Sequence, residues 1–460
     1  MPVDMVKTDL AGTKAAPSAP WPSPARAWYA IFVFALALMM NFLDRGIVGL
    51  LVRPLEQDLR LSDFQISLVT GFAYIAFYAA VGLPIARWAD IGVRRTIVGL
   101  GIAVWSLATA FCGLAQNFAQ LFIARMAVGA GESCNGPAVF SMISDLFPPH
   151  RLPRAIAVLN FGFIGGTGLA AIFGGAVIHL LSSSPSMTLP VLGTLHTWQL
   201  VFMAVGLPGL LVAALLWTVQ EPVRRGRIAG ADGRHASIPL RDVSRFFLAN
   251  RATYFPLFLG LALNTIVAFG VIVWSPEYFR RTFAWNPADF ALTSGVLILL
   301  IAPFGAMFGS WLAERLHARG RDDANLRVVV MSIVLNAPCL LLFTLAPTPM
   351  LALVGFALAQ FVTMWVPGPM NAALQVVTPN EMRATVTALF LFIFNIIGFG
   401  AGPSVAAAIT QFGFEEPAML NGALALMAGI LCPLAALSIW SGIRAYAESV
   451  RRARGWGQNL

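Results

Sequence analysis

The chain contains 460 residues, of which 58% are hydrophobic and only 11% are charged, and its formal net charge is +9. This composition excludes an ordinary soluble protein. It also excludes a nucleic-acid-binding protein, because the basic residues do not gather beside stacking aromatic side chains as such a protein requires.

The first 27 residues lack an apolar repeat, which is typical of a disordered tail and not of a cleaved signal. Segments of about 20 apolar residues then recur along nearly the whole chain, each long enough to cross a hydrocarbon core of ~30 Å. They predict an all-α integral membrane protein with twelve transmembrane helices. The expected spans are 28–51, 65–86, 97–116, 120–147, 154–181, 198–219, 253–275, 290–312, 327–346, 350–377, 384–410 and 417–443.

The basic residues set the expected orientation. With the N-terminus in the cytoplasm, 24 of the 30 Lys and Arg residues fall in the tails and cytoplasmic loops, as the positive-inside rule requires. Both termini are therefore expected to be cytoplasmic, in a multi-pass protein of the cell (inner) membrane. The predicted domains are a tail at 1–27, a six-helix bundle at 28–219, a cytoplasmic linker at 220–252, a second six-helix bundle at 253–445 and a tail at 446–460.

The two halves repeat each other in sequence. Gly136-Pro137 in the fourth predicted helix has a counterpart in Gly368-Pro369 of the tenth. Arg154-Ala155 at the start of the fifth helix matches Arg383-Ala384 at the start of the eleventh. Duplicated six-helix halves are typical of secondary transporters.

Charged residues inside the apolar segments are the first candidates for function, because charge within a bilayer is costly. Arg125, Gly129 and Glu132 face one direction on the fourth predicted helix. A rise of 1.5 Å per residue places Asp44, on the first helix, level with the gap between Arg125 and Glu132. We expect Asp44, Glu132 and Arg125 to couple protons, since a buried carboxylate responds to how closely an arginine approaches it. The alternative is a static ion pair that joins the two helices.

Polar residues next to these charges are predicted to bind substrate together with Arg125. Asn41 and Asn135 extend the polar stripe by one turn in each direction, although a buried asparagine also serves to bond a neighbouring helix. Arg45 lies about 100° around the first helix from Asp44. It either contributes to the site, or pairs locally, or extends outward to the membrane interface.

The second half offers a different kind of wall. Apart from Arg327 at the start of the ninth, its predicted helices contain no charged residue, but they contain many aromatic and aliphatic side chains, among which Phe269 and Trp365 are the predicted substrate contacts. A cavity that is polar on one wall and apolar on the other suits an amphiphile with a charged head better than it suits a sugar. The alternative is that these apolar residues face lipid or other helices.

The loop after the second predicted helix is a candidate conformational gate. Asp90, Arg94 and Arg95 lie at the cytoplasmic surface, and Glu314 occupies the equivalent place in the second half. Arginines there can hold helix ends that separate when the two halves move. The alternative is a solvated turn. Asp145 is interpreted as a surface charge that pairs with a nearby arginine.

Neither a metal nor another cofactor is expected. The four cysteines lie in apolar segments without paired spacing, and the five histidines lie in loops or at helix ends. They form no ligand pattern and no histidine–carboxylate arrangement for an intramembrane enzyme. The glycines between Gly162 and Gly175 are predicted to allow close packing of the fifth helix.

The motifs together resemble the major facilitator superfamily. Asp90, Arg94 and Arg95 are similar to the acid and paired bases of its conserved loop, and the stretch from Arg125 to Glu132 is similar to its fourth-helix motif. The resemblance covers residues 28–445 approximately. Ala86 replaces the glycine that opens the loop motif, and the fifth helix has Ala170-Ala171 where the drug–proton antiporters have Gly-Pro.

Within that superfamily the chain looks like the spinster family of lysolipid and sphingolipid transporters. The similar segments are 41–45, 125–137 and 144–148. This resemblance implies proton-linked movement of a lysophospholipid or a sphingosine phosphate, with Asp44, Arg125 and Glu132 in the pathway. The expected partners are the lipid substrate, protons and the bilayer, and the expected state is a monomer. Rival interpretations are a proton-coupled carrier of a small organic anion or an amphipathic drug, and an intramembrane enzyme.

Overall fold

The structure is a computed structural model, and it describes residues 20–148, 151–182, 186–189, 193–224, 240–379, 386, 389–390 and 396–454. Helices dominate the described chain. Those of the first half are α1 (Pro24–Leu50), α2 (Val52–Leu59), α3 (Asp63–Ser67), the π-helical η2 (Leu68–Phe72), α4 (Ala73–Ile91), α5 (Arg94–Cys112), α6 (Phe118–Glu132), α7 (Asn135–Leu146), α8 (Leu152–Ser182), α9 (Thr197–Gly206) and α10 (Pro208–Thr218).

The second half follows the helix α11. Its elements are α11 (Leu240–Ala249), α12 (Arg251–Phe283), α13 (Pro287–Ala318), α14 (Ala324–Leu345), α15 (Pro349–Thr363), α16 (Pro367–Val377), the π-helical η4 (Ile396–Ala401), α18 (Gly402–Ala408), the π-helical η5 (Ile409–Phe414), the 3-10 turn η6 (Pro417–Met419) and α19 (Leu420–Arg454).

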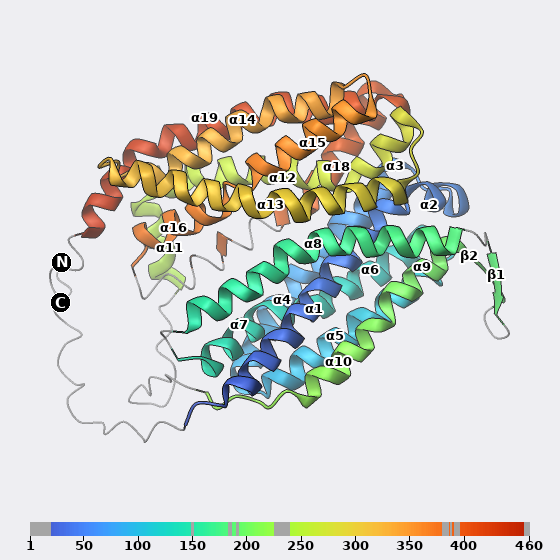
Figure 1. Cartoon of the computed structure of the whole chain (residues 1–460), viewed down its shortest axis with the longest axis horizontal. Coiled ribbons are helices and arrows are strands. Elements are labelled where there is room, and N and C mark those ends of the chain that lie inside the picture. The colour runs from blue at the N-terminus through green and yellow to red at the C-terminus, as the bar shows by residue number, and fades with distance from the viewer. Residues whose placement is uncertain are drawn as a thin grey trace.

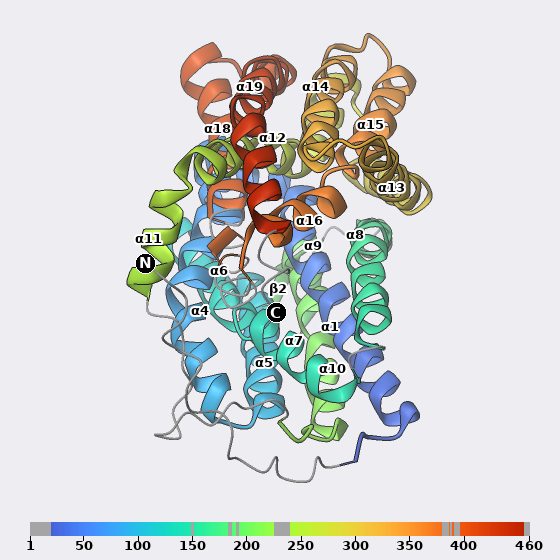
Figure 2. The same cartoon turned by 90° about the vertical axis from the view of Figure 1, so that its left-hand side faces the viewer.

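The two halves form two bundles that lie one above the other in Figure 1, with α12 to α19 above and most of α1 to α10 below, while α2 and α3 reach the height of the upper bundle at the right. The view in Figure 2 shows the same division. Within the described residues, ten segments are long and apolar enough to cross a membrane. The predicted fourth helix corresponds to α6 and α7, and the predicted fifth helix to α8. Together they account for the twelve predicted helices.

Two predicted helices are interrupted where the sequence repeats. The fourth predicted helix breaks at Ser133 and Cys134, between α6 and α7, and the tenth breaks after Thr363, between α15 and α16. In each case the new helix begins one residue before the Gly-Pro pair. Because proline lacks an amide proton and clashes with the preceding turn, it is tolerated in the first turn of a new helix. The internal repeat is therefore visible in the backbone.

Polar residues at helix starts satisfy free amide groups. The Ser62 hydroxyl accepts from the Gln65 amide at 3.2 Å while the Gln65 side chain accepts from the Ser62 amide at 3.0 Å, so α3 begins with a capping box. Asn117 caps α6 by accepting from the Gln120 amide at 3.0 Å. These caps fix the points at which α3 and α6 begin.

Several details differ from the sequence prediction. A two-stranded antiparallel sheet connects α8 and α9, with β1 (Ser186–Leu189) paired to β2 (Gly193–His196) so that Ser186 lies opposite His196. The helix α12 continues to Phe283, so Arg280 and Arg281 lie in its last turn and not in a loop. The helix α11 lies within the predicted linker.

The two halves touch near the end of the molecule that carries α2 and α3, which we call the α2 end (Figure 1). We call the opposite end, where α1 begins and α19 ends, the α11 end. At the middle of the interface, a Cβ added to Gly71 in η2 would lie 2.3 Å from the carbonyl oxygen of Phe399 in η4, so the two backbones are in direct contact. Nearer the α2 end, the Ser67 hydroxyl donates to that of Ser404 at 3.3 Å.

Glycines on α8 allow α13 of the other half to approach. An added Cβ would lie 2.6 Å from Leu299 Cγ at Gly168 and 2.8 Å from the Ala288 carbonyl oxygen at Gly175. Real side chains do not tolerate such distances. The predicted close packing of the glycine-rich helix is therefore confirmed at these two positions, and the partner is a helix of the opposite bundle.

Candidate functional site

The candidate site is a set of charged side chains buried where α1 meets α6. Asp44 and Arg45 are neighbours on α1, and Arg125 and Glu132 lie two turns apart on α6. The side chains of Asp44, Arg125 and Glu132 are between 0% and 3% exposed, and that of Arg45 is 16% exposed. Charged side chains that are buried this completely require oppositely charged or hydrogen-bonding partners nearby. The structure shows such partners for all four residues.

The four charges form two ion pairs. Arg125 Nη1 donates to Asp44 Oδ2 at 3.1 Å. Arg45 donates from Nε and Nη2 to a single oxygen of Glu132, Oε2, at 2.9 and 2.8 Å. Because consecutive residues of a helix point about 100° apart, Asp44 and Arg45 reach different turns of the same neighbouring helix.

Two hydroxyl groups that the sequence analysis missed complete the pairs. Thr109 on α5 donates to Asp44 Oδ1 at 2.6 Å. Tyr74 on α4 donates to Glu132 Oε2 at 2.6 Å. Threonine and tyrosine are common in apolar helices, so residue type alone gave no signal for either one. The only sequence signal for these two contacts was that Thr109 and Tyr74 lie at about the same depth in the membrane as the charged residues.

Two polar atoms in the site have no hydrogen-bond partner among the described residues. These are Glu132 Oε1 and Arg125 Nε, and both are fully buried. Buried polar atoms are normally paired, so such atoms mark places where a proton, a water molecule or a ligand group can be accommodated. Each of the two ion pairs thus keeps one buried polar atom without a partner among the described residues.

The backbone approach behind this geometry depends on one glycine. A Cβ added to Gly129 would lie 2.1 Å from the carbonyl oxygen of Tyr74, so α4 and α6 pack directly at that point. Gly129 lies between Arg125 and Glu132, as the sequence analysis noted. The neighbour that it admits is α4, which brings the Tyr74 hydroxyl to Glu132.

Arg45 is more central than its sequence position suggested. Its guanidinium carbon lies 4.7 Å from the ring centre of Tyr74 and 5.9 Å from that of Tyr78 on α4. It also lies 5.1 Å from the ring of Phe399 on η4, in the other half. Aromatic faces stabilise a cation electrostatically. Neither local pairing nor extension toward the interface describes Arg45, because its carboxylate partner belongs to α6.

The predicted aromatic contacts of the second half differ in their placement. Phe269 on α12 packs against Phe399, with ring centres 3.6 Å apart, and Phe399 in turn contacts Arg45. Trp365 is only 6% exposed and packs on α13, where an added Cβ on Gly309 would lie 2.4 Å from its Cα. Phe269 therefore lies one ring away from the charged site, whereas Trp365 is part of the packing within its own bundle.

The two predicted asparagines lie on either side of the ion pairs. Asn41 is buried on α1, one turn before Asp44. Asn135 is the first residue of α7, directly after the break that follows Glu132, and is half-buried. Both positions continue the polar stripe along the chain, as the spacing predicts. Their role in binding substrate stays a prediction.

The predicted gate arginine Arg94 forms a buried cluster within the first bundle. Arg94 Nη1 donates to Asp145 Oδ2 at 2.5 Å and to the Ser141 hydroxyl at 2.8 Å, both on α7. Its Nε donates to Glu221 Oε1 at 2.9 Å, after α10. Asp145 is only 6% exposed. The interpretation of Asp145 as a surface charge was therefore wrong, because α7 turns it inward toward α5.

The remaining gate residues are placed differently. Arg95 donates from its backbone amide to Glu221 Oε2 at 2.8 Å and from its side chain to the Val219 carbonyl at 3.2 Å. Asp90 is in α4, but its side chain lies outside the described residues. Glu314 is exposed on α13. The contacts that the structure shows for Arg94 and Arg95 thus hold α5 to α7 and to the segment after α10.

Cysteines and acidic residues give no metal site in the part of the chain that the structure describes. No three histidine, cysteine or acidic side chains there are grouped to hold an ion. The four cysteines are free, and three of them are buried. The candidate site is therefore built from ion pairs, hydroxyl groups and aromatic rings.

Comparison with known proteins assigns the architecture. The model of the Major Facilitator Superfamily matches residues 34–403. The chain belongs to this superfamily. Its members are transporters, so the protein is a multi-pass membrane transporter and not an enzyme.

The relatives support a more specific resemblance. An MFS-type efflux pump of Mycolicibacterium smegmatis is 28% identical over 94% of this chain and 94% of its own length. Protein spinster of Drosophila melanogaster is 22% identical over 84% of this chain and 62% of its own length. The crystal structure of a bacterial homolog of the human lysosomal transporter Spinster, in an inward-facing and unoccupied conformation, matches with a TM-score of 0.71 and 27% identity, covering 94% of this chain and 96% of that one. The predicted similarity to the spinster family is confirmed, although other relatives carry the names of anion, hexuronate and niacin transporters.

Proposed function

We propose that this transporter moves an amphipathic lipid, of the lysophospholipid or sphingosine-phosphate type, by proton-coupled alternating access. The observation that carries the proposal is the contrast between the two sides of Arg45. On one side lie Glu132 and the Asp44–Arg125 pair of the first bundle. On the other side lie Phe399 and Phe269 of the second bundle. An anionic head group fits the arginines, and an acyl or sphingoid chain fits the rings.

The way in which Glu132 is held supports proton coupling. Its Oε2 accepts three hydrogen bonds, from Tyr74 and twice from Arg45, while its Oε1 accepts none from the described residues. A proton on Oε1 removes the negative charge that holds Arg45. The arginine is then available to the anionic head group of a substrate, which replaces the lost carboxylate charge.

The second pair provides a similar exchange. Asp44 accepts a single hydrogen bond from Arg125, at 3.1 Å, and one from Thr109. Protonation of Asp44 leaves the Thr109 contact possible but weakens the attraction for Arg125. Binding of protons and binding of an anion therefore favour different arrangements of the same arginines, and a ligand shifts a conformational equilibrium by its differential affinity.

The orientation of the transport cycle rests on the distribution of basic residues. Positive-inside orientation places the α11 end in the cytoplasm and the α2 end outside. The halves meet at the α2 end, through Ser67 and Ser404 and through α8 and α13. This supports an inward-facing state for the structure, as in the spinster homolog that it resembles.

Uptake by proteoliposomes tests the proposal. Purified protein is reconstituted and offered a panel of lysolipids, with and without a pH gradient. We expect a pH gradient to stimulate lysolipid movement, and we expect Asp44→Asn and Glu132→Gln to abolish that stimulation. The exposed Glu448→Gln, on α19, serves as the matched control and should transport normally. Transport that keeps its full pH response in both core variants would refute the proton-coupling role.

A small organic anion or an amphipathic drug is the second candidate substrate, because relatives bear the names of an efflux pump and of anion transporters. A short anion uses the arginines but has no need of Phe269 and Phe399. Competition between long-chain and short-chain anions separates the two substrates. Stronger inhibition by short chains would favour the small anion and overturn the lipid proposal.

A further inference from the structure

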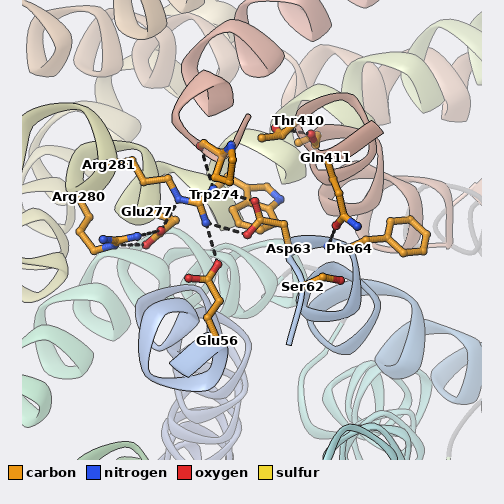
Figure 3. A network of polar contacts seen from close by, with 12 residues as sticks. Glu56, Ser62, Asp63, Phe64, Trp274, Glu277, Arg280, Arg281, Thr410 and Gln411 are labelled. Atoms are coloured by element: carbon orange, nitrogen blue, oxygen red, sulfur yellow. Dashed lines mark hydrogen bonds and ion pairs between the residues drawn. The ribbon is translucent and has the colours of Figure 1, made fainter. Parts of the chain in front are cut away.

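A second cluster of charges lies at the α2 end, where it joins the two bundles (Figure 3). Arg281, in the last turn of α12, donates two parallel hydrogen bonds to Asp63 of α3, Nη1 to Oδ2 and Nη2 to Oδ1, both at 2.7 Å. Its Nη2 also donates to Glu56 Oε1 of α2 at 2.8 Å. Asp63 and Glu56 belong to the first half, so one arginine of the second half holds two acids of the first.

The second half fixes this arginine in position. Arg281 Nε donates to Glu277 Oε1 at 2.5 Å, and Nη1 donates to the Pro417 carbonyl at 3.1 Å. Its guanidinium also lies over the ring of Trp274. The five N–H groups of Arg281 are thus matched by five hydrogen bonds. Arg280 binds Glu277 as well, so Glu277 lies between two arginines.

Neutral contacts accompany the ion pairs. The Phe64 amide of α3 donates to Gln411 Oε1 of η5 at 3.2 Å, and the rings of Phe64 and Phe412 pack edge to face with centres 5.6 Å apart. A pocket of about 580 Å³ adjoins the cluster and is lined by residues of α2, α3, α12 and η5. For the α2 end to open, α2 and α3 must separate from α12 and η5, and the Arg281 contacts must break.

The cluster contains one more acid than it has bases. Glu56, Asp63 and Glu277 face Arg280 and Arg281, so full ionisation leaves one uncompensated negative charge. Glu277 has two arginine partners and Asp63 binds Arg281 through both oxygens, whereas Glu56 receives a single hydrogen bond from Arg281. Glu56 is also the most exposed of the three acids, at 23% against 9% and 1%.

We propose that Glu56 is a proton-binding site, separate from the buried core pairs, and that its protonation holds the α2 end of the transporter closed. In the closed state a protonated Glu56 removes the excess charge and donates to the Asp63 carboxylate, while Arg281 remains bound to Asp63 and Glu277. In the open state Glu56 is separated from these acids and surrounded by water. Closing the α2 end therefore takes up a proton from that side of the membrane.

The chemistry of the neighbouring groups supports this site. Burial raises the pKa of Glu56 to about 8, and a hydrogen bond with Asp63 and the charges of Glu277 and Asp63 act in the same direction, although Arg281 opposes them. The other ionisable group at the pocket is the exposed Glu415 of the segment after η5. Asp58, on the same helix as Glu56, accepts instead from Trp198.

The direction of the pH effect follows from linkage. The pKa of Glu56 is about 8 in the closed state and near its ordinary value of 4.5 when the end is open and hydrated. The closed state thus binds more protons between those values, so its stability relative to the open state falls as pH rises. The proton on Glu56 stabilises the closed state fully below about pH 4.5. This stabilisation decreases as the pH rises through about 8 and is absent above that value.

Distance measurement without substrate tests the site. Nitroxide labels at Ala119→Cys on α6 and Met350→Cys on α15 report the separation of the halves at the α2 end, in protein with Cys339 replaced by alanine and embedded in lipid nanodiscs. We expect the ratio of closed to open protein to fall at least about tenfold between pH 5 and pH 8.5, because each pKa unit of difference corresponds to a tenfold change. Glu56→Gln, which is permanently neutral and of the same shape, should lose this fall, so that its closed-to-open ratio at pH 8.5 exceeds the native ratio at least about tenfold.

Two further variants make the result decisive. Glu415→Gln changes an exposed acid at the same pocket and should keep the native pH response. Arg281→Gln should favour the open α2 end at every pH. A native pH response in Glu56→Gln, no pH response in the native protein, or closure that increases with pH would each overturn the proposal. Since no cargo is present, these results do not depend on which substrate the transporter carries.

Discussion

Removal of Arg45 should destabilise the protein unless its partner is neutralised too. Arg45→Gln deprives Glu132 Oε2 of two of its three donors and leaves the Tyr74 hydroxyl alone to hold a fully buried carboxylate. Loss of one partner of a buried pair costs about 3–5 kcal/mol. Because Tyr74 remains, we expect about 3 kcal/mol, at the lower end of that range.

The double variant separates this effect from general damage. In Arg45→Gln with Glu132→Gln both groups are neutral, and the amide at 132 can still accept from Tyr74. We expect the double variant to lie within about 1 kcal/mol of the native protein, since neutral replacement of a whole buried pair is often nearly neutral in stability. The coupling energy between the two positions should then reach about 2 kcal/mol or more.

The assay is unfolding in mixed micelles, with SDS as denaturant and tryptophan fluorescence as the signal. Arg125→Gln is the matched control, because it removes a buried arginine from α6 without touching the Arg45–Glu132 contact. The loss of stability in Arg125→Gln should be nearly additive with that in Glu132→Gln. The coupling energy between positions 125 and 132 should therefore be smaller than that between positions 45 and 132. A coupling of less than about 0.5 kcal/mol between Arg45 and Glu132, which is the range of independent sites, would refute the reasoning.

Two other sites give sharp contrasts in the same unfolding assay. Gly129→Ala places a Cβ against a carbonyl oxygen of α4 and should cost about 1–3 kcal/mol. Gly46→Ala, on α1, meets no atom within 4 Å and should stabilise by up to about 1 kcal/mol through helix propensity. Arg94→Gln and Asp145→Asn should each cost about 3–5 kcal/mol as breaks in a buried pair, whereas the exposed Glu314→Gln should stay within about 0.5 kcal/mol of the native protein.

Specific outcomes would contradict these expectations. Equal effects at Gly129 and Gly46 would mean that α4 and α6 are not in backbone contact. A large loss in Glu314→Gln, comparable to that in Arg94→Gln, would mean that the acid of the second half has a buried basic partner, as Asp145 has in Arg94. Measuring the variants in one preparation keeps the lipid and detergent constant, so the differences report on the side chains alone.

The fold was largely predictable because its signals are local. Hydropathy, basic loops and the repeated Gly-Pro pairs need only neighbouring residues to be read, and they predicted twelve helices in two bundles. The level of Asp44 between Arg125 and Glu132 was equally accessible, since it depends only on helix rise. The rotation of one helix about its axis relative to its neighbour depends on residues that are far apart in the sequence, so local patterns do not predict it. The sequence therefore did not reveal that Arg45, and not Arg125, holds Glu132.

Charges at helix ends were the hardest to interpret. Asp145 is close in sequence to Arg151 and Arg154, but the turn of α7 buries it against Arg94. Asp63 and Arg281 are 218 positions apart, and each looks like an ordinary surface charge at the end of a segment. Such pairs depend on how the bundles dock, and no periodicity in a single sequence encodes that docking.

The placement of the two charged clusters has a consequence for coupling. Both core ion pairs lie within the first bundle, so the bundles can separate without breaking them. The Arg281 cluster joins the bundles and must break when they separate at the α2 end. In the proposed mechanism, titration in the core acts on bundle movement through a contact that spans the interface, and in this structure Arg45 makes one, against Phe399. The same arginine that balances Glu132 thus also touches the opposite bundle.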